Sequence, residues 1–303
     1  MTAVVRRIAE WNRVAAGIRR EDVLGLVPTM GALHNGHGAL FDEARKHCSV
    51  VVASIFINPI QFNQRSDYDL YPRVFDEDVA FCETRRVDYI FAPPDNEMYP
   101  LPQQAFIEIG DISEHLCGQS RPGHFRGVAT VVMKLFQILR PQLAFFGEKD
   151  YQQLAIVRRM VRDLNVSVHV VGVPTVREGD GLALSSRNRR LNPAERCLAP
   201  TLYRALLTAR RLIACGERNA AAIKDAAILV LQNVPQIKLD YIELVDPGTI
   251  RRVDVVQAPV RAAGAIWIGD VRLIDNVYCD PAQHSTEDCS TQLSMRTCGV
   301  NVR

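Results

Sequence analysis

The 303-residue chain is long enough for one large domain or for two domains of ordinary size. Its apolar fraction of 48% and its charged fraction of 23% are those of a globular, soluble protein. A formal net charge of +2, without any basic block, argues against nucleic-acid binding. No apolar run approaches the roughly 18 residues that a membrane span needs.

The first element is a mixed-charge segment, from Arg6 to Asp22, which predicts an amphipathic surface helix, with a transit peptide as the open alternative. Beyond it, strand and helix patterns alternate. Apolar or β-branched runs predict strands over 24–27, 49–57, 87–92, 143–146 and 166–173. Helix patterns lie between them, beginning near residue 36 and then over 76–86, 128–139 and 154–164.

This alternation predicts a Rossmann-like, doubly wound α/β fold with a mostly parallel sheet. In such sheets, ligands bind outside the carboxyl ends of the strands. The loop after Val27 and the loop after Phe146 both follow strands. We therefore expect these two loops to meet at one edge of the sheet.

After Pro174 the pattern changes. Asn192 and Pro193 form a helix-start signal, an N-cap followed by proline at the first helical position, and one helix is predicted from there to Ile213. A second helix is predicted near 220–233, with short strands over 239–245, 265–268 and 271–274. We expect one domain over 1–175, a smaller α+β domain over 176–280, and a polar, disordered tail over 281–303.

The turn after the first strand holds the densest group of candidate site residues. It covers 27–37 and reads V-P-T-M-G-A-L-H-N-G-H. Pro28 and Gly31 are expected to end the strand, and a helix follows, so its free N–H groups and positive dipole end suit a phosphate. His34 and His37 share one face of the first helical turn, where they could donate hydrogen bonds and carry charge near neutral pH. The alternative is an ordinary pair of surface histidines.

Two common nucleotide-binding motifs are missing from the sequence. There is no G-x-x-x-x-G-K-[S/T] run, which excludes a P-loop, and no G-x-G-x-x-G that opens a helix. The His34-x-Gly36-His37 turn instead resembles the H-x-G-H signature of nucleotidylyltransferases and class I aminoacyl-tRNA synthetases. Leu184-Ser-Ser-Arg187 resembles the second signature of that superfamily, a Lys-Met-Ser-Lys-Ser-like loop.

The chain as a whole resembles one family in this group, pantothenate synthetase. The blocks that carry the resemblance lie at 28–37, 54–62, 71–73, 121–128, 146–154, 180–188 and 272–276. Two departures are visible, Ser66 where the family usually has an acid and Arg190 where it usually has tyrosine. Both put only loop detail in doubt, and the terminal tail lies outside the resemblance.

The resemblance implies an enzyme that joins pantoate to β-alanine with ATP, through a pantoyl-adenylate, and releases AMP and diphosphate. It implies that Gln61 and Gln153 bind pantoate, that Gln61 also lies near β-alanine, and that His34, His37 and Lys149 are catalytic. The residues placed against ATP are Met30, Gly31, Ala32, Leu33, His34, Asn35, Gly36, His37, Gly147, Glu148, Lys149, Asp150, Val176, Leu184, Ser185, Ser186 and Arg187.

The resemblance also implies the roles of the two domains, a metal ion, the oligomeric state, the location and the partners of the enzyme. Residues 1–175 would bind ATP and pantoate, and 176–280 would form a lid. Mg²⁺ would enter with ATP, held mainly by phosphate oxygens with Asp150 as the candidate protein ligand. We expect a cytoplasmic homodimer whose partners are the three small-molecule substrates, not nucleic acid or a membrane.

Physical chemistry agrees with these roles. Negative charge builds on phosphate oxygens during adenylation, and Lys149 and the two histidines can donate to it. A lysine at a helix start is disfavoured by the dipole, which favours a phosphate partner. Neutral amides at Gln61 and Gln153 offer substrate hydroxyl groups both donors and acceptors.

Other interpretations stay open at this point. Ser185 and Ser186 could be ordinary turn residues, and the two glutamines could be satisfied core amides. A related nucleotidylyltransferase is the main rival, and it would need cationic residues in place of the glutamines. A catalytically silent nucleotide-binding regulator would be expected to lose some of the motif residues, all of which are present.

Overall fold

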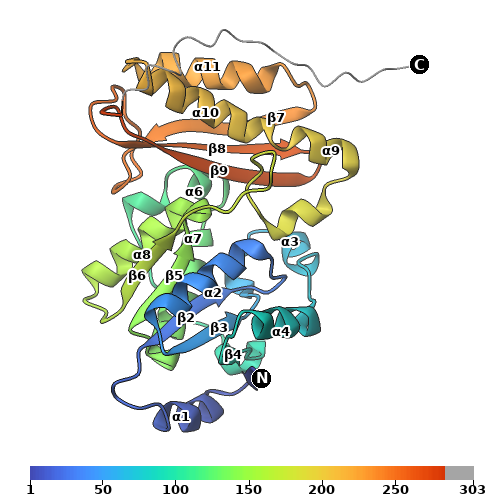
Figure 1. Ribbon diagram of the computed structural model, residues 1–303, viewed down its shortest axis with the longest axis vertical. Helices are drawn as coiled ribbons and strands as arrows, with labels where there is room; N and C mark the ends of the chain where they lie inside the picture. Colours follow the sequence, from blue (N-terminus) through green and yellow to red (C-terminus); the bar gives the residue numbers. More distant parts are fainter. Residues whose placement is uncertain (284–303) are drawn as a thin grey trace.

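The computed structural model describes residues 1–283, which form two sheets with helices packed around them (Figure 1). The larger sheet has six strands, all parallel, in the order β1-β4-β3-β2-β5-β6. These strands are β1 Ala3–Val5, β2 Leu24–Thr29, β3 Val50–Ile55, β4 Tyr89–Phe91, β5 Leu143–Gly147 and β6 His169–Val173. We call the large sheet and its helices the N-terminal unit.

Helices cover both faces of the large sheet and bury an apolar core on each. On one face, Trp11, Leu135 and Leu154 belong to a single buried cluster. On the other, Phe41 and Cys82 pack with the strands in a second cluster. The helical elements of this unit are α1 Ile8–Ala16, α2 Asn35–His47, η1 Pro59–Gln61, α3 Arg65–Asp69, α4 Phe75–Thr84, α5 Asp95–Met98, η2 Asp111–Ser113, α6 Cys117–Ser120, α7 His124–Leu139, η3 Glu148–Asp150 and α8 Tyr151–Asp163. The predicted doubly wound α/β fold is confirmed.

The strand order reverses between β2 and β5. From β2 the chain moves outward through β3 to β4, then returns to the other side of β2 for β5 and β6. Open parallel sheets bind ligands in the crevice beyond the carboxyl ends of the strands at such a switch point. Strand β2 ends at Thr29 and β5 ends at Gly147. The two loops that were expected to meet therefore flank this crevice.

The second sheet, with its helices, forms what we call the C-terminal unit. It is antiparallel, with strand order β7-β8-β9. Its elements are η4 Ser186–Arg190, α9 Pro193–Leu198, α10 Thr201–Ala214, α11 Ala220–Gln232, β7 Ile237–Val245, β8 Val260–Ile268 and β9 Val271–Cys279. Figure 1 shows α10 and α11 on the face of this sheet that points away from the large sheet. This arrangement confirms a smaller α+β part.

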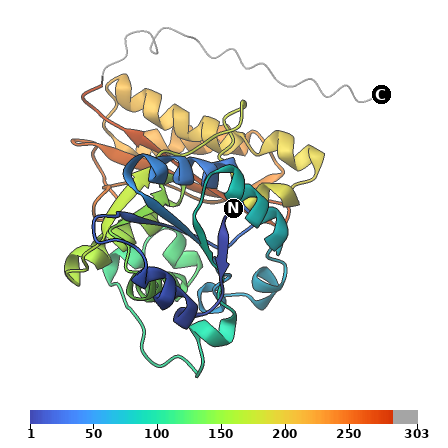
Figure 2. The same ribbon diagram turned by 60° about the horizontal axis from the view of Figure 1, so that its bottom comes forward.

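An apolar cluster joins the two units. It includes Ile112, Phe125 and Ile156 from the N-terminal unit and Ile250 and Ala263 from the C-terminal unit. Helix α1 lies at the opposite end of the molecule from α11, in both views (Figures 1 and 2). The crevice at the ends of β2 and β5 consequently opens toward the junction of the units, not toward α1.

Three features of the local structure differ from what the sequence predicted. The edge strand β1 was missed, because three residues give no usable periodicity. Pro28 does not end its strand, since β2 continues to Thr29. The single helix expected from Pro193 to Ile213 is divided into α9 and α10, with Ala199 and Pro200 between them. Pro200 has no N–H to continue the hydrogen bonding of α9.

The predicted tail lies mostly outside the described residues. Only its first residues are described, and there Pro281 is buried and its carbonyl oxygen accepts a hydrogen bond from Arg218 Nη2 at 2.9 Å. The expectation of disorder therefore fails at the first residue of the tail. Within residues 1–283, none of the helices is both long and apolar enough to span a bilayer.

Candidate active site

The turn from β2 into α2 presents two imidazole rings on the first turn of a helix. His34 is the N-cap of α2, and its Nδ1 accepts a hydrogen bond from the Gly36 N–H at 3.1 Å. His37 Nδ1 accepts from the His34 N–H at 3.3 Å. Because both Nδ1 atoms accept, both neutral rings carry their hydrogen on Nε2. The turn thus offers two Nε2–H donors, and neither has a partner among residues 1–283.

The shape of this turn depends on a glycine and on a carboxylate. A Cβ at Gly36 would come within 2.8 Å of the His34 ring, so a larger residue would displace the N-cap. Asp78 of α4 is 3% exposed, and its carboxylate accepts hydrogen bonds from the Ala32 and Leu33 N–H groups at 3.0 and 2.7 Å. Asp78 was missed, because in sequence it is one of three acidic residues in the first turn of a helix.

The expectation that the two histidines carry charge near neutral pH is wrong. Burial, then the charge of Lys149, lowers the pKa of His34 to about 4. Burial, followed by His34 and Lys149, lowers the pKa of His37 to about 3. The rings also lie against each other, with centroids 4.2 Å apart. Both are neutral at pH 7 and act there as hydrogen-bond donors, not as cations.

The corner after β5 holds the lysine and is fixed from the C-terminal unit. Asn276 of β9 donates Nδ2–H groups to the carbonyl oxygens of Glu148 and Lys149 at 2.8 and 3.0 Å. Arg261 of β8 pairs with Glu148 at 2.8 Å. Lys149 Nζ lies 3.6 Å from the Asp150 carboxylate. The backbone at Lys149 therefore follows a strand of the N-terminal unit and is also hydrogen-bonded to the C-terminal unit.

Two neighbouring glutamines on α8 have different environments. Gln152 is a satisfied core amide that accepts from the Cys117 N–H and donates to the carbonyl oxygens of Ile112 and His115. Gln153 has no hydrogen-bond partner among residues 1–283 and faces the space between the units. Its amide is therefore available to a ligand.

Gln61 lies opposite, in η1. Its Oε1 accepts from Asn58 Nδ2 at 3.1 Å, and its Nε2 lies 2.9 Å from the Met30 sulfur. Asn58 also donates to the Gly127 carbonyl oxygen and accepts from the Tyr99 hydroxyl, which fixes it from two sides. Asn58 orients the Gln61 amide and was missed as a functional residue, although the Asn-Pro-x-Gln block contains it.

The loop before η4 crosses to the N-terminal unit. The Leu184 N–H donates to the Val176 carbonyl oxygen at 3.0 Å, which closes the loop. Ser185 Oγ accepts from the Arg187 N–H at 3.3 Å, so this serine does act as a cap. Arg187 pairs with Asp67 of α3 at 3.2 Å. The loop is therefore anchored on the opposite wall of the crevice.

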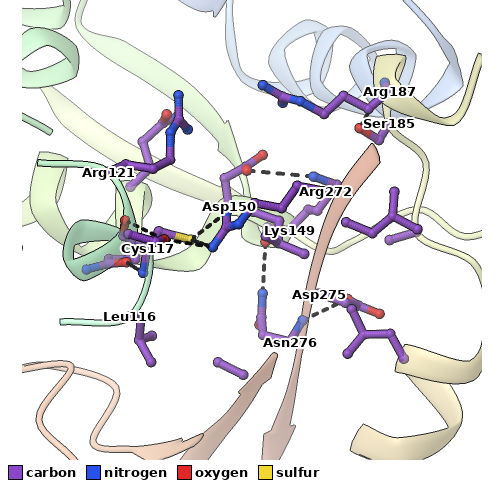
Figure 3. A pocket seen from close by; sticks show the side chains of 18 of the residues that line it. Leu116, Cys117, Arg121, Lys149, Asp150, Ser185, Arg187, Arg272, Asp275 and Asn276 are labelled. Carbon is purple, nitrogen blue, oxygen red and sulfur yellow. Dashed lines mark hydrogen bonds and ion pairs between the residues drawn. The ribbon is translucent and has the colours of Figure 1, made fainter. Parts of the chain in front are cut away.

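Two adjoining cavities lie between the units, of about 230 and 500 Å³. The predicted residues that line the smaller one are Met30, His34, Gly36, His37, Gln61, Gly147, Lys149, Asp150, Gln153, Val176, Leu184, Ser185, Ser186 and Arg187. The larger cavity, seen in Figure 3, shares five of these, Lys149, Asp150, Gln153, Ser185 and Arg187. Residues from distant parts of the sequence thus face one space.

Five predicted residues do not line either cavity. Ala32 and Leu33 are buried in the core, and their N–H groups are taken by Asp78. Gly31 precedes them with a positive φ of 81°. Asn35 turns outward, where its Oδ1 accepts from Arg85, and Glu148 is paired with the C-terminal unit. In this structure these residues shape the walls and do not reach a ligand with their side chains.

Acidification is expected to destabilise the ligand-free protein through its buried histidines. Burial also lowers the pKa of His124 to about 3. A histidine with a lowered folded-state pKa contributes stability above its unfolded pKa near 6.5, and loses it as the pH falls toward the folded value. For His34, His37 and His124 together, we expect the free energy of unfolding to fall by about 3–4 kcal/mol between pH 7 and 5.5.

Urea denaturation at the two pH values measures this loss. In His124→Asn an amide keeps a donor for the Gln61 carbonyl oxygen but does not titrate, so the loss should shrink by about 1 kcal/mol. The buried carboxyls of Asp78 and Asp275, whose pKa values burial raises, act in the opposite sense but are common to both proteins. An equal loss in the two proteins would contradict the prediction.

The fold and the site together define a class of protein. A doubly wound sheet that carries an H-x-G-H turn and a lysine at its switch point is typical of α/β enzymes that bind a nucleotide. The family model described as Pantoate-beta-alanine ligase matches residues 3–278. The chain belongs to this family, and its function is the ATP-dependent joining of pantoate to β-alanine.

Curated relatives and solved structures agree. Pantothenate synthetase 1 of Bradyrhizobium diazoefficiens is 49% identical over 276 residues, which are 90% of this chain and 97% of that protein. A pantothenate synthetase structure from Thermus thermophilus has a TM-score of 0.87 at 47% identity, covering 91% of this chain and 99% of that one. The pantoate-beta-alanine ligase of Francisella tularensis, described as complexed with beta-gamma ATP and beta-alanine, has a TM-score of 0.77 at 33% identity, covering 91% and 97%.

Proposed function

We propose that the smaller cavity binds ATP and pantoate, and that β-alanine reaches them from the larger cavity. One observation carries this proposal: the two Nε2–H donors of His34 and His37, Lys149, and the free amide of Gln153 converge at the carboxyl ends of β2 and β5. The Lys149 charge is close enough to lower both histidine pKa values. A triphosphate placed there would meet three of these donors, from His34, His37 and Lys149, and the N-terminus of α2.

In the first step, a pantoate carboxylate oxygen attacks the α-phosphorus of ATP. A bond forms between that oxygen and phosphorus, the bond from the α-phosphorus to the bridging oxygen breaks, and diphosphate leaves with the electron pair. Negative charge grows on the phosphate oxygens during this step, where His34, His37 and Lys149 can donate. Gln61 and Gln153 would hold the pantoate hydroxyl groups, because a neutral amide both donates and accepts.

In the second step, the β-alanine nitrogen attacks the acyl carbon of pantoyl-adenylate. A carbon–nitrogen bond forms, the carbon–oxygen bond to AMP breaks, and the nitrogen loses a proton to solvent. Ser185, Ser186 and Arg187 come from the C-terminal unit and Lys149 from the N-terminal unit, so the nucleotide would be held from both sides. Such enclosure limits hydrolysis of the adenylate.

We propose that Mg²⁺ accompanies ATP as part of the bound substrate. The Asp150 side chain is 48% exposed beside Lys149 and can supply one oxygen ligand. Within residues 1–283, no three side chains of His, Cys, Asp or Glu come together to hold a metal. Phosphate oxygens and water would therefore provide most of the ligands, as is usual for this ion. When bound, Mg²⁺ neutralises part of the triphosphate charge.

Three further predictions accompany this function. We propose that 1–175 is the domain that binds ATP and pantoate, and that 176–280 is a lid domain that supplies Val176 and the loop from Leu184 to Arg187. The crossing of that loop to Asp67 supports a lid. Homodimerisation and a cytoplasmic location remain predictions from the family resemblance.

An end-point assay tests the proposed function. The purified chain is incubated with ATP, Mg²⁺, pantoate and β-alanine, and pantothenate and AMP are measured together. We expect equal amounts of the two products, and none when either acid is left out. A nucleotidylyltransferase would release diphosphate without AMP, and that result would overturn the proposal.

A further inference from the structure

Arg121 differs from the other arginines that line the two cavities. The other four are paired with carboxylates: Arg187 and Arg190 with Asp67, Arg261 with Glu148, and Arg272 with Asp240. Arg121 has no acidic partner within residues 1–283. Its guanidinium is partly buried where the two cavities join, on the wall shown in Figure 3. Burial, with the nearby charge of Arg187, lowers its pKa to about 10.

His124 holds this guanidinium in one orientation. His124 Nδ1 lies 2.8 Å from the Gln61 carbonyl oxygen, which can only accept, so the ring donates from Nδ1. Its Nε2 then accepts from Arg121 Nη1 at 3.1 Å. This contact uses one of the five guanidinium N–H donors. The remaining N–H groups have no partner among residues 1–283, and a planar fork of this kind matches a carboxylate.

The chemistry of the reaction selects which anion Arg121 would meet. The phosphates of ATP would be met by His34, His37 and Lys149 at the ends of β2 and β5. The pantoate carboxylate loses its charge when it becomes an acyl phosphate, which would leave an opposing cation unpaired in the intermediate. The β-alanine carboxylate does not react and stays charged from entry to release. A charge taken into a cavity needs such a permanent partner.

We propose that Arg121 binds the carboxylate of β-alanine, with His124 as its positioning residue, and so selects an amino acid over a plain amine. The assignment rests on the proposed function of the two cavities. Two methylene groups separate the carboxylate of β-alanine from its amine. An anchor at the junction of the cavities therefore points the amine into the smaller cavity, where the acyl group would lie.

Acceptor selectivity tests the assignment. Propylamine has the amine and carbon chain of β-alanine with a methyl group in place of the carboxylate. In the wild-type chain, kcat/KM for β-alanine should exceed that for propylamine by about 10³. In Arg121→Met, kcat/KM for β-alanine should fall by about 10²–10³, while that for propylamine changes less than threefold. Arg121→Lys keeps the charge but lacks the planar fork of N–H groups, so its kcat/KM for β-alanine should fall by about tenfold.

Two controls separate this role from others. Arg126→Met removes an arginine in the first turn of α7 whose side chain is 47% exposed and 3.9 Å from Glu108, and it should keep the wild-type selectivity. In Arg121→Met, pantoate-dependent exchange of labelled diphosphate into ATP without β-alanine should stay within about threefold of wild type. His124→Asn is too short to span both contacts and should lower the selectivity about tenfold.

Two results would overturn the assignment. One is an equal loss for β-alanine and propylamine in Arg121→Met. The other is a loss of diphosphate exchange as large as the loss of amide formation, which would place Arg121 on ATP or pantoate. A wild-type chain that exchanged diphosphate but formed no pantothenate would overturn the proposed function itself, and this assignment with it.

Discussion

Replacing His37 by alanine is expected to slow pantoyl-adenylate formation by about 10²–10³, the effect of removing one positioned donor from a developing oxyanion. The reason is geometric: the His37 Nδ1 accepts from the His34 N–H, so its Nε2–H is fixed and faces the smaller cavity. The alanine variant also removes the second half of the capping box. Rapid-quench measurement of the adenylate in a single turnover reports this step directly.

The matched control lies on the same helix. His47→Ala changes a surface histidine at the far end of α2, with a side chain 51% exposed and 3.1 Å from Glu43. It should adenylate at the wild-type rate. His37→Gln restores an N–H donor and should recover part of the loss. Wild-type adenylation by His37→Ala would remove this histidine from the catalytic site.

Replacing Lys149 by alanine is expected to slow the first half-reaction by about 10²–10³ and to spare the second. Among the described residues that line the two cavities, Lys149 is the only lysine, and its side chain is 18% exposed. Diphosphate carries most of the charge that it would offset, and diphosphate has left before β-alanine reacts. The measurement compares adenylate formation from ATP with amide formation from purified pantoyl-adenylate.

A surface lysine provides the reference. Lys46→Ala removes a cation whose side chain is 66% exposed and paired with Glu43 at 2.7 Å, and both half-reactions should stay at the wild-type rate. If Lys149→Ala lost amide formation as strongly as adenylation, the lysine would act on AMP or on the acyl group, and the separation of roles would be wrong.

Much of the fold could be predicted, because long apolar runs and periodic helices give clear signals. The runs around Val52 and Phe145 correspond to the buried strands β3 and β5, and the loops that follow β2 and β5 flank the switch point. The short edge strand β1 gave no such signal. The helical spacing of apolar residues continues from α9 across Pro200 into α10, so periodicity alone does not reveal the break between the two helices.

The site was less predictable, because environment decides what a polar side chain does. Gln152 and Gln153 are adjacent glutamines, yet the Gln152 amide is fully hydrogen-bonded to backbone groups while the Gln153 amide has no partner among residues 1–283 and lines the smaller cavity. They differ because the segment from η2 to the first residue of α6 packs against α8 at Gln152. Burial beside Lys149 makes both motif histidines neutral, which spacing cannot reveal.

The role of Arg121 could not be predicted from the sequence either. Its motif block was visible, but the lack of an acidic partner is a property of the folded walls, where every other cavity arginine within residues 1–283 is paired. Asp78 is a further case, since its carboxylate is buried under the H-x-G-H turn and holds two of its N–H groups. Each of these roles follows from contacts between residues far apart in sequence.

The most direct test of the account is isotope exchange in the absence of β-alanine. The central claim is that the smaller cavity completes adenylation of pantoate before the second acid enters. With ATP, Mg²⁺ and labelled diphosphate, the chain should move label into ATP when pantoate is added, and should not do so without pantoate. Exchange that required β-alanine would contradict a separate adenylation step and would favour a concerted mechanism.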